Sequence, residues 1–426
     1  MSYDEIKDLV VYALNEGFQI HPDLIRVLQD QPELIPKVIE VISKKKEYGS
    51  SELTITLKDI ESFGLNLEID KTNLVINSER SLSDGLQVSS YEEINLALSS
   101  RFKKMKELWM QRPSKTPLYP VSFILSKGKE AMWSFVMVVG KSMKKGLEAL
   151  VDDGKNVYSL KVSSVKVFEG LIPGMCAAVK INPDGATIED YEDVEFQEIK
   201  RKKAKGKIAL ISDLLIGSNR VDGLFSSIKS AKVDGVLFLG NIVDSYAYIK
   251  NGLPPAEGYR QAAKLVSSLP SRILKVFVPG PLDSTGRALP QKPLSYKVAK
   301  DLYSTQNSRI LSNPSYVTIN NSLFLLYNAK YLLESLPEYR EEEAVRKVLK
   351  IRHMAPSFGT IPVVPFSSDK LIVEDVPDYF FVGGGREKVD FIYRGVWSVG
   401  VPSYKACRCY AIVDLGKESV EWVSAG

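Results

Sequence analysis

Histidine is scarce in this chain of 426 residues, which contains only His21 and His353. Any mechanism that needs several histidine ligands or a histidine base is therefore nearly excluded. Cysteine is scarce too, and three cysteines cannot build a disulfide framework. Cys407 and Cys409 have the wrong spacing for a zinc knuckle. A reducing cytoplasm is the compartment that we expect.

Long hydrophobic runs are also missing. No uninterrupted apolar run reaches the ~18–20 residues that a membrane helix needs, so we expect no membrane contact. The N-terminus, MSYDEIKDLVVYAL, is acidic and amphipathic, and it lacks the basic start of a signal peptide. Hydrophobic residues make up 44% and charged residues 25% of the chain, which is ordinary for a globular protein. The net charge of +4 is too small to indicate nucleic-acid binding by itself.

The N-terminal part of the chain is predicted to be helical. Residues 4–16 repeat apolar residues at helical spacing, and Pro22 and Pro32 stand where two further helices are expected to begin. Residues 1–47 are therefore predicted to form a small helical module, which either docks a partner or caps the structure. Residues 48–89 are mixed, polar and partly Ser-rich, which predicts a linker.

A helix and a small barrel are predicted next, over residues 90–200. Ser90 and Glu93 have the spacing of a capping box, so a helix is expected from Ser90 to Arg112. Short β-type runs come after it, beginning with VSFILS at residues 121–126 and separated by Gly, Asn, Asp and Lys. Several such strands in a short segment are typical of the OB-fold.

Two lysine-rich segments flank these predicted strands. KSMKKG, at residues 141–146, is expected to be a hairpin loop, and KRKKAKGK, at residues 200–207, links the barrel to the C-terminal region. Such segments either attract phosphates or are simply solvated turns and linkers. The candidate DNA contacts are Lys141, Lys144, Lys145, Lys200, Arg201, Lys202 and Lys203.

Residues 201–426 alternate apolar strands with helical stretches, which predicts a layered α/β domain. The whole chain is thus expected to be a multidomain α+β protein. In an α/β domain of this kind, the site lies on the loops that come after the strands. The loops with polar signatures are Ser212–Leu215, Gly240–Asp244, Pro279–Asp283, Tyr327–Ala329 and Gly383–Arg386. A two-metal phosphoesterase places Asp, Asn and His on such loops.

These loops resemble the calcineurin-like phosphoesterase pattern D-x-H, G-D-x-x-D, G-N-H-D, a lone H and G-H-x-H. The surrounding sequence is similar to one branch, the small subunit of the archaeal family D DNA polymerase. The similar stretches are Asp283–Pro293, Arg352–Gly359 and Asp369–Asp378. The resemblance covers most of the chain and is strongest over residues 205–400.

The departures from that pattern fall on the residues that bind metal in the family. Asp213 keeps the first aspartate. The other six ligand positions of the family hold Leu215, Asn241, Pro281, Asn328, Gly384 and Arg386, and Leu282 stands in place of the histidine of G-N-H-D. One carboxylate and two amides are too few to hold a pair of Mn²⁺ or Zn²⁺ ions tightly. We therefore expect no bound metal, no other cofactor and no catalytic residue.

Four ionisable residues of this region carry further expectations. Arg386 is predicted to pair with Asp213 and replace the missing metal charge. Asp244 and Asp283 stand in turn contexts, where aspartate commonly accepts hydrogen bonds from the backbone. His353 lies outside the ligand positions and is expected to be a structural residue.

The resemblance implies an accessory subunit that binds the large catalytic subunit of a replicative polymerase, and meets DNA through the holoenzyme. A sliding clamp is a further candidate partner. Family members with an intact site are 3′–5′ exonucleases, an activity that we expect to be lost here. Two alternatives remain. One is a nuclease with a rearranged metal site that recruits Asp375 or Asp378, and the other is a single-stranded DNA-binding protein.

Overall fold

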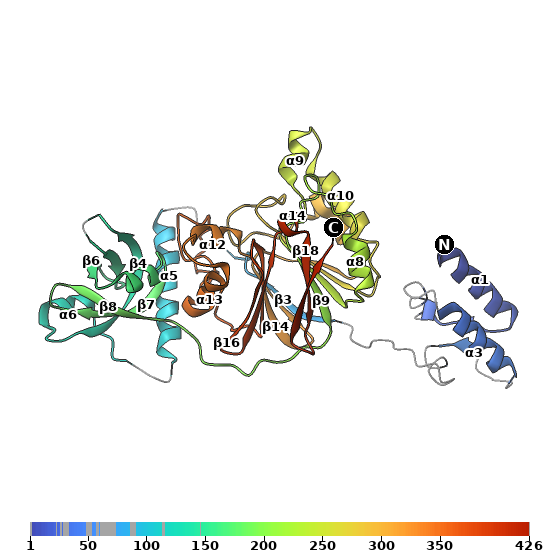
Figure 1. Cartoon of the computed structure of the whole chain (residues 1–426), viewed down its shortest axis with the longest axis horizontal. Coiled ribbons are helices and arrows are strands. Elements are labelled where there is room, and N and C mark those ends of the chain that lie inside the picture. Colours follow the sequence, from blue (N-terminus) through green and yellow to red (C-terminus); the bar gives the residue numbers. More distant parts are fainter. Residues whose placement is uncertain are drawn as a thin grey trace. The chain divides into compact units, whose positions relative to one another are not determined.

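The computed structural model is a mixed α+β structure (Figure 1). It describes residues 2–22, 24–25, 28, 34–47, 53–56, 59, 74–85, 91–112, 116–144 and 146–425. The chain forms two compact units, Met1–Asn73 with Pro270–Arg272, and Leu74–Leu269 with Ile273–Gly426. Within the described ranges, no helix combines the length and the apolar character needed to cross a membrane.

The described residues of the smaller unit include helical segments and a short parallel sheet. Its elements are α1 (Ser2–Asn15), β1 (Gln19–Ile20), α3 (Ile35–Glu47) and β2 (Thr54–Ile55). Leu9, Val38 and Ile55 belong to its buried core. Most of the helix predicted after Pro22 lies outside the described residues.

The larger unit contains a closed barrel of strands preceded by two helices. The helices are α5 (Tyr91–Met110) and α6 (Val121–Lys127). The barrel strands, in spatial order, are β4 (Met132–Ser142), β5 (Glu148–Asp152), β6 (Val157–Val162), β8 (Thr187–Asp193) and β7 (Cys176–Asn182). Helix α7 (Val165–Gly170) connects β6 to β7, and Ser164 caps it by accepting a hydrogen bond from the amide of Val167. Val136, Val151 and Val179 point into the barrel core, as alternation along a strand requires.

Three segments of this region differ from the sequence prediction. VSFILS was predicted to be a strand but forms α6, because Val121 and Ile124 are buried at a spacing of one helical turn. Strand β8 was not predicted, since its sequence TIEDYED is largely polar and only Ile188 is buried. Strand β3 (Ile76–Ser81) lies inside the predicted linker and pairs with a strand of the second sheet described next.

The rest of the larger unit is a sandwich of two six-stranded sheets. The first sheet contains, in spatial order, β12 (Ser308–Ile310), β11 (Leu274–Val278), β10 (Gly235–Leu239), β9 (Lys207–Ile211), β18 (Cys409–Asp414) and β19 (Ser419–Ser424). The second contains β16 (Val389–Tyr393), β17 (Val396–Pro402), β15 (Tyr379–Gly385), β14 (Ser322–Asn328), β13 (Ser315–Ile319) and β3. Strands β9, β10 and β11 run parallel, as do β14 and β15.

Helices cover the outer faces of the sandwich, and apolar residues such as Leu210, Val276 and Phe381 fill the space between the sheets. The helices packed with residues of the first sheet are α8 (Leu224–Ser230), α10 (Pro255–Val266) and α11 (Tyr296–Tyr303). Those packed with the second sheet are α12 (Lys330–Ser335) and α13 (Glu341–Ile351). Two short helices, α9 (Ser245–Lys250) and α14 (Tyr404–Cys407), come directly after strand-end loops.

The barrel and the sandwich share one continuous hydrophobic cluster, which includes residues of α13 and of the barrel strands. Buried polar contacts reinforce this junction. Lys347 of α13 forms an ion pair of 2.9 Å with Asp193 of β8, and both side chains are buried. Arg101 of α5 pairs with Asp369 at 2.6 Å and also donates to the carbonyl oxygens of Gly174 and Pro356.

His353 completes the buried group around Asp369. Its Nδ1 accepts the amide hydrogen of Ala355, so Nε2 carries the proton and donates to Asp369 at 3.0 Å. Burial and the nearby charge of Arg101 lower the pKa of His353, which therefore stays neutral. Burial alone would raise the pKa of Asp369, but Arg101 and His353 outweigh it and lower that pKa strongly. His353 is a structural residue, as expected.

Acid should weaken this junction. The unfolded chain takes up a proton on His353 near pH 6.5, whereas folded His353 resists protonation because its pKa is lowered. The free energy of unfolding is therefore expected to fall as the pH drops below about 6.5, by at most about 1.4 kcal/mol per pH unit from this group. Urea denaturation of the wild type and His353→Gln at several pH values measures the difference. If the free energy of unfolding changes equally with pH in the wild type and in His353→Gln, His353 is not the group that makes the stability depend on pH.

Candidate functional site

The polar loops predicted from the sequence meet at one edge of the sandwich. Because β9, β10 and β11 are parallel, their carboxyl ends lie together, and the carboxyl ends of β14 and β15 face them from the second sheet. Two hydrogen bonds join the sheets here. Nδ2 of Asn328 donates to the carbonyl oxygen of Leu239 at 2.8 Å, and the amide of Gly384 donates to Oγ of Ser212 at 2.8 Å.

Asp213 is the central residue of this edge. Its side chain is buried and its φ of 55° lies in the left-handed region. Oδ1 accepts hydrogen bonds from Nδ2 of Asn241 at 2.8 Å and from Oγ of Ser212 at 3.3 Å. Burial raises the pKa of the Asp213 carboxyl, an effect opposed by Asn241, by the charge of Lys330 and by Ser403. Hydrogen-bond donors from the chain itself therefore surround the carboxylate of Asp213.

Asn241 uses both ends of its amide. The nitrogen donates to Asp213, and the oxygen accepts the amide hydrogen of Leu282 at 2.7 Å. The residue is fully buried and has a φ of 48°. Asn241 therefore connects the first and third loops by hydrogen bonds, and its oxygen already has a donor.

Asn328 is buried beside this group, and its Oδ1 has no hydrogen-bond partner within the described part of the chain. Gly384 leaves space for the side chain of Asn328. The φ of Gly384 is +85°, and a β-carbon on Gly384 would lie 2.9 Å from Oδ1 of Asn328. Any residue other than glycine at position 384 would thus be strained and would crowd the amide.

The predicted pair between Arg386 and Asp213 is not formed. The backbone amide of Arg386 donates to the carboxylate of Glu341 at the start of α13, and the Arg386 side chain is exposed. The cation that acts on Asp213 is instead Lys330, which begins α12. Lys330 lies two positions after Asn328, so its nearness could have been inferred from the sequence.

The remaining positions of the pattern are apolar or structural. Leu215 and Pro281 are buried. Asp283 accepts hydrogen bonds from the amides of Ile242, Val243 and Gly280, and burial raises its pKa to about 6. Asp244 caps α9 through the amide of Ala247. Both aspartates organise backbone, as expected.

The donor set around Asp213 differs from that of a two-metal centre. Within the described ranges, no three or more His, Cys, Asp or Glu side chains come together in a way that could hold a metal ion. The amide oxygen of Asn241 is occupied by Leu282, so Asp213 and Asn328 are the side chains left with oxygen ligands. Divalent cations of this kind need several carboxylates or imidazoles.

The lysine-rich segments are more tightly packed than linkers would be. Nζ of Lys141 donates to the carbonyl oxygen of Phe168 at 2.8 Å, and burial lowers its pKa. Arg201 pairs with Glu418 at 2.8 Å and lies over the rings of Tyr379 and Trp397. These two residues therefore have structural roles.

The other candidates for DNA contact differ in their surroundings. Lys203 pairs with Glu418 at 3.0 Å. Lys144, Lys200 and Lys202 are exposed, and the backbone amide of Lys202 donates to Asp378 at 2.6 Å. Lys145 lies outside the described residues. DNA contact through the exposed lysines stays a prediction.

Comparison with known proteins finds similarity to subunits of DNA polymerases. Residues 208–390 match the family of the B subunits of DNA polymerases alpha and epsilon. These residues lie in the sandwich, so the similarity to polymerase B subunits covers part of the chain. Relatives of the chain include small subunits of archaeal DNA polymerase II. The one from Methanothermobacter thermautotrophicus is 25% identical over 94% of both chains. The one from Pyrococcus furiosus is 28% identical over 41% of this chain, a match that spans 31% of that relative.

Solved structures that align with about half of the chain include phosphoesterases. An archaeal phosphodiesterase, 14% identical with a TM-score of 0.31, aligns with 51% of this chain and 98% of its own. The phosphoesterase Yfce from E. coli, 12% identical with a TM-score of 0.28, aligns with 52% of this chain and 100% of its own.

Proposed function

We propose that this protein is the accessory small subunit of a family D DNA polymerase and binds the large catalytic subunit. The near full-length similarity to the Methanothermobacter small subunit is the observation that carries the proposal. The protein contacts DNA as part of the holoenzyme. A sliding clamp is a further candidate partner. The shared hydrophobic cluster and the buried pairs at Arg101 and Lys347 favour this role, because they join barrel and sandwich into one rigid surface.

We further propose that the barrel is an OB-fold and the sandwich a phosphoesterase-type domain. The barrel order β4-β5-β6-β8-β7, with α7 between β6 and β7 in the chain, is that of a five-stranded Greek-key barrel. The sandwich supports the second assignment because its polar loops gather at the carboxyl ends of parallel strands. The N-terminal helical module predicted over residues 1–47 is proposed to extend to β2, because Ile55 belongs to its buried core.

We also propose that the ancestral metal site binds no metal and that the exonuclease activity is lost. Asn241 supports this proposal. Its amide nitrogen donates a hydrogen bond to the carboxylate of Asp213, and its amide oxygen accepts one from the backbone amide of Leu282. The partial positive charge on the hydrogens of that amide nitrogen, together with Lys330, takes over part of what a metal cation supplies to Asp213.

The alternative of a rearranged metal site is not favoured by the geometry. Asp378 precedes β15 and accepts the amides of Lys202 and Leu323, so it lies at the strand end opposite Gly384. Asp375 forms an exposed ion pair with Arg80. Asp378 thus holds backbone at the other end of its strand and Asp375 pairs with Arg80, so neither is set to supply the additional ligands that Asp213 would need to hold a metal.

We expect the purified protein to degrade single-stranded DNA in the presence of Mn²⁺ no faster than its Asp213→Ala variant. A metal-dependent nuclease would lose its activity with that carboxylate, whereas a site without metals has none to lose. Release of nucleotides from a labelled oligonucleotide measures the rate. Activity in the wild type that disappears in Asp213→Ala would overturn the proposed loss of function.

Binding of the partner is tested separately. The full chain, co-expressed with the large catalytic subunit of the same organism, is expected to co-purify as a complex that survives gel filtration. Failure to co-purify would contradict the accessory-subunit proposal, whatever the nuclease assay shows. A chain that alone binds single-stranded DNA tightly, with a steep salt dependence, would favour the single-strand-binding alternative.

A further inference from the structure

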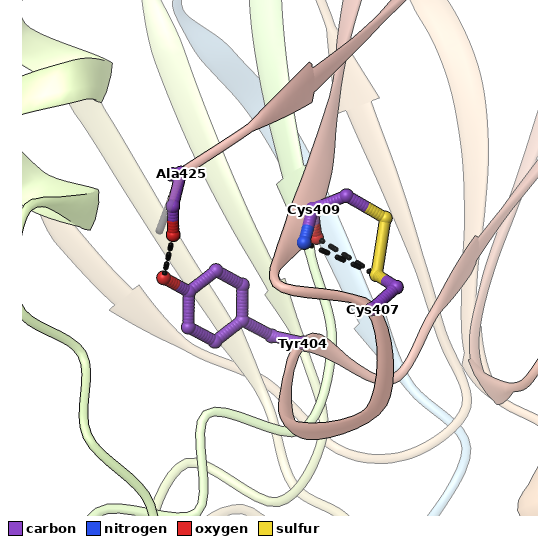
Figure 2. The surroundings of a disulfide bond; sticks show 4 residues. All are labelled: Tyr404, Cys407, Cys409 and Ala425. Carbon is purple, nitrogen blue, oxygen red and sulfur yellow. Dashed lines mark hydrogen bonds between the residues drawn. A yellow bond between two sulfur atoms is a disulfide. The ribbon is translucent and has the colours of Figure 1, made fainter.

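A disulfide joins Cys407 and Cys409, at the turn between α14 and β18 (Figure 2). Only Arg408 separates them, with a φ of 52°. The sequence led us to expect no disulfide framework, and this single bond was not foreseen. The entropy that a disulfide removes from the unfolded chain grows with the length of the loop it closes. A bond across one residue therefore contributes little to global stability, and its effect is local.

The turn that holds the disulfide contacts two other parts of the sandwich. Oη of Tyr404 donates to the carbonyl oxygen of Ala425 at 2.6 Å (Figure 2), and the amide of Ala425 donates to the carbonyl oxygen of Arg408 at 2.8 Å. On its other side, the amide of Tyr404 donates to the carbonyl oxygen of Ser212 at 2.8 Å. One turn thus fixes the residue after β19 and the residue before Asp213.

The two cysteine residues differ in exposure. Cys409 is buried, at 5% exposure, whereas Cys407 is partly exposed. The third cysteine, Cys176, is buried in the barrel, and burial raises the pKa of its thiol to about 12. A thiol that is buried and protonated reacts slowly, so Cys176 does not compete for reagents. An external thiol therefore reaches the disulfide at Sγ of Cys407.

We propose that Cys407 and Cys409 are a reversible two-electron redox site, opened by a dithiol and closed by a peroxide. A thiolate of the dithiol attacks Sγ of Cys407, the bond between the two cysteines breaks, and Cys409 leaves as a thiolate that takes up a proton. The second thiol of the reagent then displaces Cys407. The reagent is oxidised to its own disulfide, and both cysteines are reduced to thiols.

Closure takes the opposite course. The thiolate of Cys407 attacks a peroxide oxygen, which gives a sulfenic acid and releases hydroxide or an alkoxide. The thiolate of Cys409 then attacks the Cys407 sulfur and releases hydroxide, which restores the disulfide. In each direction two electrons pass between the cysteine pair and the reagent.

Opening the disulfide releases the constraint on Arg408. The left-handed backbone conformation of Arg408 is uncommon for a residue with a side chain. Without the disulfide, the reduced turn is less constrained to that conformation. The carbonyl oxygen of Arg408 holds the amide of Ala425, and this contact is expected to weaken first. Tyr404 links the same turn to Ser212, so the change reaches the loop of Asp213.

The thiol count tests the first half of the proposal. Full-length protein treated with hydrogen peroxide, then denatured, is expected to show one reactive thiol, from Cys176. After dithiothreitol it should show all three cysteines of the chain. Cys176→Ala is the matched control, and should keep the reversible loss of two thiols. Three thiols in the peroxide-treated wild type would overturn the proposal.

Reactivity of the single thiols tests the direction of attack. In Cys409→Ser the remaining Cys407 should form a mixed disulfide with an aromatic disulfide reagent about tenfold faster than Cys409 does in Cys407→Ser. Equal rates would contradict the assignment of Cys407 as the attacked sulfur.

Hydrogen exchange of the wild type, which needs no variant, tests the structural consequence. The amides of Ala425 and Tyr404 are expected to exchange about tenfold faster in the reduced than in the oxidised protein. The barrel amides should be unchanged. Identical exchange in both states would show that the bond does not control the turn, and would overturn the second half of the proposal. These outcomes do not depend on whether the polymerase assignment holds.

Discussion

Replacing Asp369 by asparagine is expected to lower the free energy of unfolding by about 3–5 kcal/mol at pH 7. Asp369 is the buried counter-charge of Arg101, whose side chain is only 2% exposed. Asparagine leaves the guanidinium buried with the carbonyl oxygens of Gly174 and Pro356 but without a negative charge. Removing one partner of a buried ion pair costs far more than the pair itself contributes. Urea denaturation measures the change.

Asp375→Asn is the matched control, because it makes the same chemical change a few positions away. The pair between Asp375 and Arg80 is exposed, and exposed pairs contribute about 0–1 kcal/mol. If Asp369→Asn and Asp375→Asn have the same stability, the buried group around Asp369 does not hold the junction of barrel and sandwich.

Replacing Asn241 by aspartate is expected to lower the free energy of unfolding by about 2–4 kcal/mol at pH 7. The variant restores the carboxylate that the phosphoesterase pattern has at this position, but it removes the hydrogen bond to Asp213 and sets two buried carboxylates against each other. One of them then takes a raised pKa. Between about pH 4 and that pKa, the folded variant binds more protons than the unfolded chain. The difference in free energy of unfolding between the variant and the wild type should therefore shrink when the pH is lowered to about 5.

Asn251→Asp is the control for this prediction, since Asn251 is exposed after α9 and a surface change of this kind is usually within about 0.5 kcal/mol. Thermal unfolding with and without Mn²⁺ provides a second measurement. Mn²⁺ should not rescue Asn241→Asp, because Leu215 and Gly384 still offer no ligands. Rescue by Mn²⁺ would show that the metal site is more complete than we propose.

The sequence was informative where a residue's type limits its role. Buried and mainly apolar strands such as β10 and β11, and the polar loops after them, could be predicted because parallel strands place their carboxyl ends together. The loss of imidazole and carboxylate residues from these loops is likewise visible without a structure.

Other features depend on contacts that a linear pattern does not contain. Strand β3 reads as a polar linker because an edge strand with mostly exposed side chains needs no apolar alternation. Arg386 was predicted to reach Asp213, but the carboxylate of Glu341, 45 positions earlier in the chain, fixes its backbone elsewhere. The sequence also could not show that Lys141 and Arg201 take part in packed contacts, because those contacts are not contained in a linear pattern.

The pairing of β3 also has a consequence for how the protein is made. The chain leaves the sandwich after β3, builds α5 and the barrel, and returns to the sandwich at β9. The partner of β3 is β13, and Asn320, which bonds Val75 beside this pair, is 245 positions further on. At a synthesis rate of about 5–20 residues per second, β3 waits on the order of 10–50 s for its partner. During that time the barrel can fold ahead of the domain that surrounds it in sequence.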